Sequence, residues 1–214
     1  MSTTDQNPAF AYWKQNLIVL WAVQVFSQMS YGLALPFTAF YLRELGLSDP
    51  NEVKLWVGLL TMAPGLTMAI FAPVWGKLSD KYGRKLMVMR SQYASGVILT
   101  LMGLVPNPAW FLITRVVQGT VTGTVVAAST FVAANTPKDK MGRALGFLSS
   151  ANFIGYSLGP AVGGFLAGWL GYRPTFWISG AMAILAGIAV TFLISEPGFS
   201  KAERAKIVNS AVSS

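Results

Sequence analysis

Residues 76–85 read Gly76-Lys77-Leu78-Ser79-Asp80-Lys81-Tyr82-Gly83-Arg84-Lys85, and this stretch decides the fold. It holds five charged residues, yet apolar runs flank it on both sides, at 55–75 and 86–105. Each flanking run has about the 20 residues that an α-helix needs to cross a hydrocarbon core of ~30 Å. The pattern therefore predicts a charged turn between two membrane-spanning helices.

The composition is typical of a membrane protein. Of the 214 residues, 53% are hydrophobic and only 11% are charged, whereas a soluble domain has about 25% charged residues. The mean hydropathy is +0.51. The chain contains no Cys and no His, which excludes disulfides, thiol chemistry and ordinary zinc sites, so no metal or cofactor is expected. The net charge of +8 does not indicate nucleic-acid binding, because the basic residues cluster in short loops at predicted membrane edges.

Six apolar segments predict an all-α membrane protein in which residues 1–196 form a six-helix bundle. They lie at 17–42, 55–75, 86–105, 110–134, 145–170 and 175–194. We expect two inverted three-helix repeats, an arrangement common in transporters. Prolines within these segments are tolerated where neighbouring helices satisfy the carbonyls that they leave free. Residues 197–214 are polar, and we expect a cytoplasmic tail or the start of a central loop there.

The distribution of Lys and Arg predicts the orientation. Twelve of the sixteen lie on one side of the predicted membrane, and Arg43, Lys54 and Arg173 lie on the other. Arg115 lies inside a helix. The positive-inside rule then places both termini and the 76–85 turn in the cytoplasm, in a multi-pass protein of the plasma membrane with lipid as its surroundings.

The 76–85 turn fits the pattern G-x-L-x-D-[RK]-x-G-[RK]-[RK]. It resembles the signature loop between the second and third helices of the major facilitator superfamily, and the resemblance extends from about Leu17 to Ile194. In that family the loop implies a gate in which Asp80 contacts a second six-helix half and releases it as the halves rock. The alternative is that the basic residues only anchor the topology. The gating residues implied by the resemblance are Gly76, Asp80, Lys81, Gly83, Arg84 and Lys85.

Segment 145–170 carries a second signature. Gly155, Gly159 and Gly163 recur at every fourth position, so they form a groove that a second backbone can approach closely. Pro160 bends the same helix. Together with Gly164 they complete G-x-x-x-G-P-x-x-G-G, which resembles the antiporter signature of the same superfamily and implies export by antiport. The alternative is ordinary packing of small residues.

A polar stripe crosses segment 110–134, where Arg115, Gln118 and Thr122 recur at i, i+3 and i+7. An arginine at this depth costs about 2.5–3.5 kcal/mol on insertion scales, so it faces a wet cavity unless it snorkels to the membrane edge. Its R-x-x-x-G context is similar to a superfamily signature that implies proton transfer. Further polar residues are expected to line the same cavity or to hydrogen-bond between helices, namely Gln24, Gln28, Tyr31 and Asn152.

The eight acidic residues all fall in predicted loops, turns or tails. The drug:proton antiporter group, which this chain resembles most, often carries an acid in the first helix, whereas Gln28 stands at that place here. A proton-coupled exporter needs a group near the cavity that gains and loses a proton. If protons are the coupling ion, we expect the titrating acid to lie outside these 214 residues.

The three signatures together imply the N-terminal half of a proton-coupled multidrug efflux antiporter that carries a small hydrophobic substrate by alternating access. One alternative is a facilitator or symporter for a sugar or an organic anion. Another is a non-transporting membrane scaffold or assembly subunit. An intramembrane enzyme is disfavoured, because the predicted helices hold neither a Ser/His pair nor embedded aspartates. The second half would be a missing segment, a separate chain or a second copy.

Overall fold

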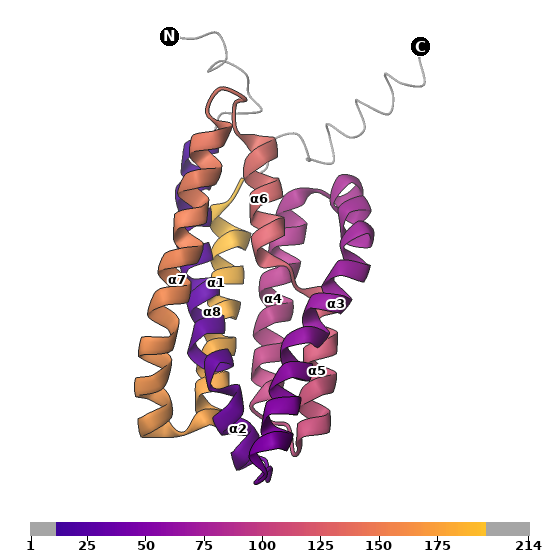
Figure 1. Ribbon diagram of the computed structural model, residues 1–214. Coiled ribbons are helices and arrows are strands. Elements are labelled where there is room, and N and C mark those ends of the chain that lie inside the picture. The colour runs from indigo at the N-terminus through magenta and orange to yellow at the C-terminus, as the bar shows by residue number, and fades with distance from the viewer. Residues whose placement is uncertain (1–11, 196–214) are drawn as a thin grey trace.

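The computed structural model describes residues 12–195, and within this range the chain is helical without any strand (Figure 1). The tail predicted at 197–214 lies outside the described residues. The elements are α1 (Trp13–Ala34), η3 (Leu35–Phe37), α2 (Thr38–Glu44), α3 (Pro50–Tyr82), α4 (Arg84–Met102), α5 (Pro108–Val121), α6 (Thr124–Asn135), α7 (Met141–Leu170) and α8 (Tyr172–Leu193).

The helices make six passes along the bundle. The first pass consists of α1, η3 and α2, the fourth consists of α5 and α6, and each remaining helix makes one pass. By length and composition, five of the described passes could cross a membrane, and α4 is not among these five. The first turns of α4 hold Arg84, Lys85 and Arg90, which lower its apolar character, yet α4 packs within the bundle against α8. The predicted all-α membrane fold is confirmed.

Both ends of the described chain lie at the same end of the bundle (Figure 1). The Asn16 side chain joins them, since its Nδ2 donates to the carbonyl of Ser195 (2.6 Å) and its Oδ1 accepts from the Ser195 N–H (3.1 Å). The α3–α4 and α6–α7 connections lie at this end too, with Lys77, Lys81 and Lys140. We call it the basic end, and the end that holds α2 and the α7–α8 connection the opposite end.

The helix packing has the symmetry of two inverted three-pass repeats. The first pass packs on the fifth through α1 and α7, just as the fourth packs on the second through α5 and α3. The first pass also packs on the sixth, and the fourth on the third, while α4 and α8 pack on each other. If passes one, two and three exchange places with passes four, five and six, the same pairs of passes therefore remain in contact. Since the first and fourth passes start at opposite ends, the repeats are inverted.

The predicted segments differ from the structure in several places, and the first pass, predicted as one helix at 17–42, is interrupted by η3. The helix predicted at 110–134 is broken, because Gly123 adopts left-handed backbone angles (φ 111°, ψ 42°) that a glycine reaches without a Cβ clash. The predicted 76–85 turn is mostly helix, since α3 continues to Tyr82 and the reversal occurs at Gly83 (φ 97°). With 33 residues α3 is about 50 Å long, so its charged last turns can extend beyond the hydrocarbon into water.

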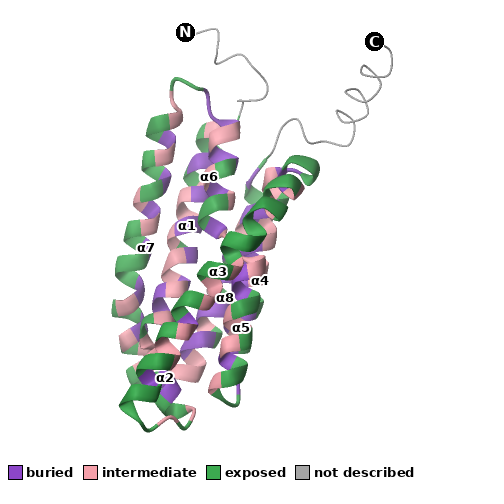
Figure 2. Cartoon of the chain, turned by 45° about the vertical axis from the view of Figure 1, so that its right-hand side comes forward, coloured by how far each residue is buried: buried purple, intermediate pink, exposed green. Residues whose placement is uncertain are grey.

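Two hydrophobic clusters fill the bundle. The cluster nearer the basic end includes Leu20, Phe131, Leu148 and Val190, and the other includes Leu60, Tyr41, Phe111 and Phe176. Buried polar side chains of α1 and α4 lie among these helices, including Gln24, Ser27, Gln92 and Ser95. Buried residues face the inside of the bundle, while α3 and α7 expose long outer faces (Figure 2). Those faces suit lipid or another helical unit.

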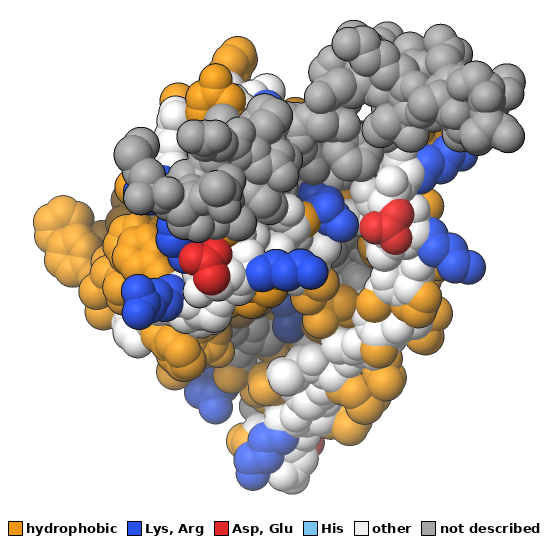
Figure 3. Space-filling view, turned by 90° about the horizontal axis from the view of Figure 1, so that it is seen from above, with side chains coloured by type: hydrophobic (Ala, Val, Ile, Leu, Met, Phe, Trp, Pro, Cys, Tyr) orange, Lys and Arg blue, Asp and Glu red, His pale blue; other side chains and the backbone are white. Residues whose placement is uncertain are grey.

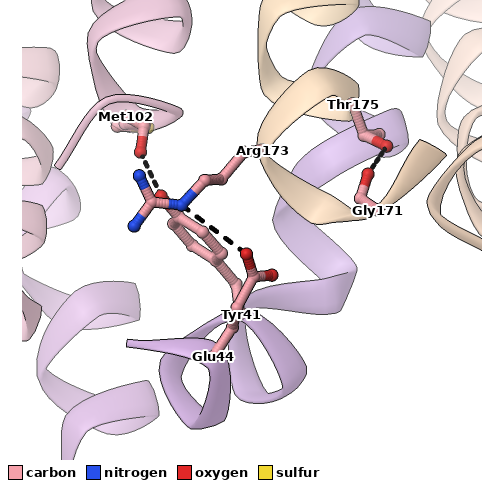
Figure 4. Close-up of polar contacts among 6 residues, drawn as sticks. All are labelled: Tyr41, Glu44, Met102, Gly171, Arg173 and Thr175. Carbon is pink, nitrogen blue, oxygen red and sulfur yellow. Dashed lines mark hydrogen bonds and ion pairs between the residues drawn. The ribbon is translucent and has the colours of Figure 1, made fainter. Parts of the chain in front are cut away.

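The opposite end is tied together by Tyr41 (Figure 4). Its hydroxyl donates to the carbonyl of Met102 (2.9 Å), and its ring packs on Phe111 and Phe176 with centroids 5.4 and 4.9 Å away. Nearby, Arg173 Nε lies 3.5 Å from Glu44 Oε1, which joins α8 to α2. These contacts link the first, third, fourth and sixth passes.

Replacing Tyr41 with phenylalanine is expected to destabilise the fold by about 1–3 kcal/mol. Met102 is the last residue of α4, so no N–H group further along the helix donates to its carbonyl. In the variant this carbonyl would also lose the hydrogen bond from the Tyr41 hydroxyl. Thermal unfolding of the purified protein in detergent measures the effect. Tyr156→Phe is the matched control because Tyr156 is 62% exposed. Equal stability of both variants would contradict the role of this bond.

Candidate functional site

A cavity of about 250 Å³ lies beside the break in the fourth pass, between α1, α3, α5 and α6. Four predicted polar residues line it: Tyr31, Arg115, Gln118 and Thr122. None of the described lining residues is Asp, Glu or Lys. The rest of the lining is apolar or small, namely Leu35, Pro64, Gly65, Met68, Gly119, Gly123, Thr124, Val125 and Val126.

Arg115 is held by two acceptors inside the protein. Its Nε donates to the carbonyl of Leu60 (2.8 Å), and its guanidinium also donates to Gln118 Oε1 (2.6 Å). The carbonyl of Leu60 is available because Pro64, four residues later in α3, has no N–H. The proline thus creates the acceptor that orients the arginine, and these bonds favour a cavity position over snorkelling.

Gly119 allows α5 to approach α3 at this place. A Cβ at Gly119 would collide with the backbone of Pro64 and with the Thr67 hydroxyl. Thr67 Oγ1 also lies 3.1 Å from the carbonyl oxygen of Val116, so its one proton is shared between this carbonyl and that of Ala63 in its own helix (3.0 Å). Arg115 and Gly119 are four residues apart and share one face of α5. The R-x-x-x-G spacing therefore places the arginine next to the carbonyl freed by Pro64.

Tyr31 links the cavity to α4. Its hydroxyl lies 2.5 Å from Ser95 Oγ, and Ser95 in turn donates to the carbonyl of Ser91 (2.6 Å). A serine hydroxyl has one proton, so the Tyr31 hydroxyl is the donor to Ser95. The Tyr31 hydroxyl therefore connects the cavity to the hydrogen-bonded serines of α4.

The end of α5 is held by Trp75 and Arg90. Trp75 Nε1 donates to the carbonyl of Thr120 (2.5 Å), and Arg90 donates to the carbonyl of Val121 while lying 3.5 Å from the centroid of the Trp75 ring. Carbonyls in the last turn of a helix lack helical donors, and a cation is favourable there. The broken pass thus has its own cap.

A second cavity of about 200 Å³ continues from the break towards the basic end. Asp80, Gly76 and Arg90 line it, and it shares Thr122 and Gly123 with the Arg115 cavity. The break in the fourth pass therefore lies between the Arg115 site and the charged end of α3.

The predicted gating residues have different surroundings. Gly76, Asp80 and Lys81 are exposed on the last turns of α3, whereas Gly83 forms the reversal. Arg84 is half-buried at the start of α4. Lys85 Nζ donates to the carbonyl of Thr191 near the end of α8 (2.8 Å), which ties α4 to α8 within this unit. The exposed carboxylate of Asp80 is therefore placed where a second helical unit could contact it.

The three glycines of the second signature face α1. A Cβ at Gly155, Gly159 or Gly163 would collide with the α1 backbone at Val25, Gly32 and Leu33, respectively. The ring of Pro160 also lies against Gly32, and Gly164 lies near the Phe37 ring. The groove is therefore occupied by α1 and is not open to a second copy.

The chain matches the sequence profile of the Major Facilitator Superfamily over residues 20–211. It belongs to this superfamily. It is 38% identical over 196 residues to "Multidrug resistance protein MdtG" of Escherichia coli O81 (strain ED1a), which covers 92% of this chain and 48% of that protein. It is 39% identical over 184 residues to the protein of the same name from Proteus mirabilis (strain HI4320), covering 86% and 46%. The chain spans about half the length of the curated relatives it matches.

Three further cavity candidates of this superfamily member, Gln24, Gln28 and Asn152, are not among the described residues that line the Arg115 cavity. Gln24 is fully buried, and neither of its amide atoms has a hydrogen-bond partner among the described residues. Gln28 lies against α7 where Gly155 permits close approach. Asn152 lies on α7, and its Oδ1 is buried. The packing of α1 against α7 decides which surface of each helix faces the cavity, and the spacing of polar residues in the sequence does not reveal that packing.

Three residues that hold this site were not predicted as functional from the sequence, namely Pro64, Trp75 and Arg90. A proline inside a membrane helix signals a free carbonyl four residues earlier, which identifies Leu60. Arg90 falls within the predicted segment 86–105, and an arginine inside a membrane segment is a functional candidate by itself.

Pro64→Ala is expected to reduce transport by the full-length superfamily transporter severalfold. An alanine N–H at 64 would donate to the carbonyl of Leu60 and compete with Arg115 for it. The initial rate of substrate efflux, normalised to the amount of protein in the membrane, measures the effect. Pro73→Ala is the matched control, since Pro73 lies in the same helix but outside this cavity. Equal rates for the two variants would contradict the Pro64 role.

Proposed function

We propose that this chain is the N-terminal half of a proton-coupled multidrug efflux antiporter that works by alternating access. The observation that carries the proposal is the Arg115 cavity, in which one fixed cation meets mostly apolar walls. Apolar walls suit a small hydrophobic substrate, and the flexible side chain of Met68 can adapt to different shapes. The names of the MdtG relatives support export of drugs.

The partner in this proposal is a second six-helix half. The exposed apolar faces of α3 and α7 offer surfaces on which it can pack. Asp80 would contact this partner at the basic end, and breaking the contact would allow the halves to rock. Because no described residue that lines the Arg115 cavity is an acid, the proton-binding carboxylate would come from the partner.

Transport by the full-length protein in inside-out membrane vesicles tests the proposal. A fluorescent hydrophobic cation such as ethidium should accumulate when the vesicle interior is acidic, and a proton ionophore should stop this accumulation. Accumulation that does not depend on the pH gradient would contradict proton antiport. Absence of any accumulation, with the protein correctly inserted, would contradict drug export.

A second candidate is a facilitator or symporter for an organic anion, and one observation favours it. Arg115 has no carboxylate beside it in the cavity lining, so an anionic group could pair with its guanidinium. Competition separates the candidates: inhibition of ethidium transport by hydrophobic cations supports the exporter, whereas uptake inhibited only by anions supports the alternative.

In this proposal the protein lies in the plasma membrane, and its basic end faces the cytoplasm. Labelling can test it directly because the chain has no cysteine. Lys54 and Lys77 are exposed at opposite ends of α3. In intact cells a membrane-impermeant maleimide should label Lys54→Cys at once and Lys77→Cys only after permeabilisation. The reverse pattern would contradict the orientation.

A further inference from the structure

A basic pocket of about 340 Å³ opens at the basic end between the first turns of α1 and α7. Among the described lining residues, three are cationic and none is a carboxylate. The apolar lining residues Leu17, Ala144 and Phe147 come after the charged ones along α1 and α7. The lining consists of Trp13, Lys14, Leu17, Lys140, Arg143, Ala144 and Phe147.

Trp13 organises the charges of this pocket. Lys14 Nζ and Lys140 Nζ each lie 5.6 Å from the centroid of its ring. An aromatic ring attracts an ammonium group, so Trp13 holds the Lys14 ammonium at the pocket. Trp13 itself has the amphipathic ring that favours the headgroup level of a membrane. Asp139, next in sequence to Lys140, is exposed and outside the lining.

The view onto the basic end shows the same bias. Blue Lys and Arg side chains spread around this end with fewer red acidic ones, although grey residues cover part of it (Figure 3). A layer of cations at one end of the bundle creates a field that attracts anionic headgroups from the neighbouring leaflet.

An apolar groove of about 400 Å³ runs between α1 and α8. Its walls are exposed, since Ile18 is 62%, Phe26 54% and Leu185 63% accessible. Every described residue that lines it has an apolar side chain. The lining consists of Ile18, Val19, Ala22, Val23, Phe26, Met182, Leu185, Ala186, Ala189 and Leu193.

One ridge of α1 joins the pocket to the groove. Lys14, Ile18, Ala22 and Phe26 are each four residues apart, so their side chains follow one another along the helix surface. Lys14 lines the basic pocket, and the other three line the groove. The ridge covers about 18 Å from Lys14 to Phe26. A ligand that fits both parts has an anionic head and a hydrocarbon chain of comparable length.

We propose that this joined site binds one anionic phospholipid, with its phosphate in the Trp13–Lys14–Arg143 pocket and one acyl chain along the α1–α8 groove. A free phosphate would occupy only the pocket and gain nothing from the groove. A neutral lipid would occupy only the groove. The combination selects a lipid with a net negative headgroup, and the joined site shares no described lining residue with the Arg115 cavity.

Native mass spectrometry of the delipidated full-length protein tests the site. Titration with phosphatidylglycerol should give one tightly bound lipid, whereas phosphatidylcholine of the same chain length should bind at least tenfold more weakly. The double variant Lys14→Gln with Arg143→Gln should weaken phosphatidylglycerol binding roughly thirtyfold and leave phosphatidylcholine binding unchanged. The matched control is Arg43→Gln with Lys77→Gln, which removes the same charge from exposed positions elsewhere.

Three outcomes would overturn the proposal. The first is unchanged phosphatidylglycerol binding in the Lys14/Arg143 variant, and the second is equal weakening in the control, which would indicate a general effect of charge. The third is binding of glycerol phosphate as tight as that of the lipid, which would indicate an anion pocket alone. Filling the groove with Ala22→Phe should weaken lipid binding severalfold without affecting glycerol phosphate, and Ala161→Phe on the exposed face of α7 is its control.

Discussion

Arg115→Met is expected to reduce the initial rate of pH-gradient-driven efflux by roughly tenfold to a hundredfold, while the protein still inserts and folds. Methionine keeps much of the side-chain volume but removes both donors, so the Leu60 carbonyl and Gln118 Oε1 lose their charged partner. A hydrogen bond to a charged group contributes about 1.5–3 kcal/mol, and the expected range corresponds to the loss of one such bond from the transport cycle. Efflux normalised to membrane protein measures the result.

The matching lysine variant separates charge from geometry. Arg115→Lys retains the positive charge, but a single ammonium cannot reproduce the fixed fork that reaches Leu60 and Gln118 together. We expect an intermediate rate. Arg43→Met is the control, because Arg43 is exposed near the end of α2. If Arg115→Met kept more than half of the original rate, the proposed role of the cavity would be wrong.

Gly159→Val is expected to prevent stable folding or to lower the unfolding temperature by roughly 6–12 °C. Even the first carbon of the new side chain would lie 2.8 Å from the carbonyl carbon of Gly32 and 3.0 Å from the carbonyl oxygen of Met29. Backbone atoms cannot move aside without moving α1, and such overpacking costs about 3 kcal/mol. Thermal unfolding and the yield of monodisperse protein in detergent measure the loss.

The control for this prediction lies on the same helix. Gly168 has no neighbouring atom within 4 Å of an added Cβ, so Gly168→Val should fold and transport normally. Equal loss in both variants would mean that α7 requires glycine for backbone reasons alone. Loss at Gly159 only would support the close α1–α7 contact.

Much of the fold was predictable because the bilayer limits what a chain can do. Backbone polar groups must be satisfied within each segment, so long apolar runs such as 55–75 become helices. Their ends were less predictable, since α3 extends to Pro50 and Tyr82 in places where water can solvate its charges. The break at Gly123 was also missed, because a glycine in a membrane segment fits a continuous helix equally well.

The candidate site was predictable in part. Arg115, Gln118 and Thr122 share one face of a single segment, and the 3.6-residue period reveals this without any neighbour. Tyr31 joins them in the structure, whereas Gln24 and Gln28, which lie in the same predicted helix as Tyr31, do not line this cavity. The difference arises because α7 covers the α1 surface near Gln28, and that contact depends on glycines more than 120 residues later in the chain.

By itself the sequence determined the six passes, the concentration of positive charge at one end and membership of the superfamily, because hydropathy, charge position and motif spacing are properties of single segments. The tertiary structure decided that the carbonyl freed by Pro64 holds Arg115, that α1 fills the glycine groove of α7, and that a basic pocket meets an apolar groove along α1. Each of these results requires two helices to meet at a particular depth in the membrane and with a particular rotation about their axes. In lipid, close packing between the helices determines this arrangement, and the hydropathy of either helix does not.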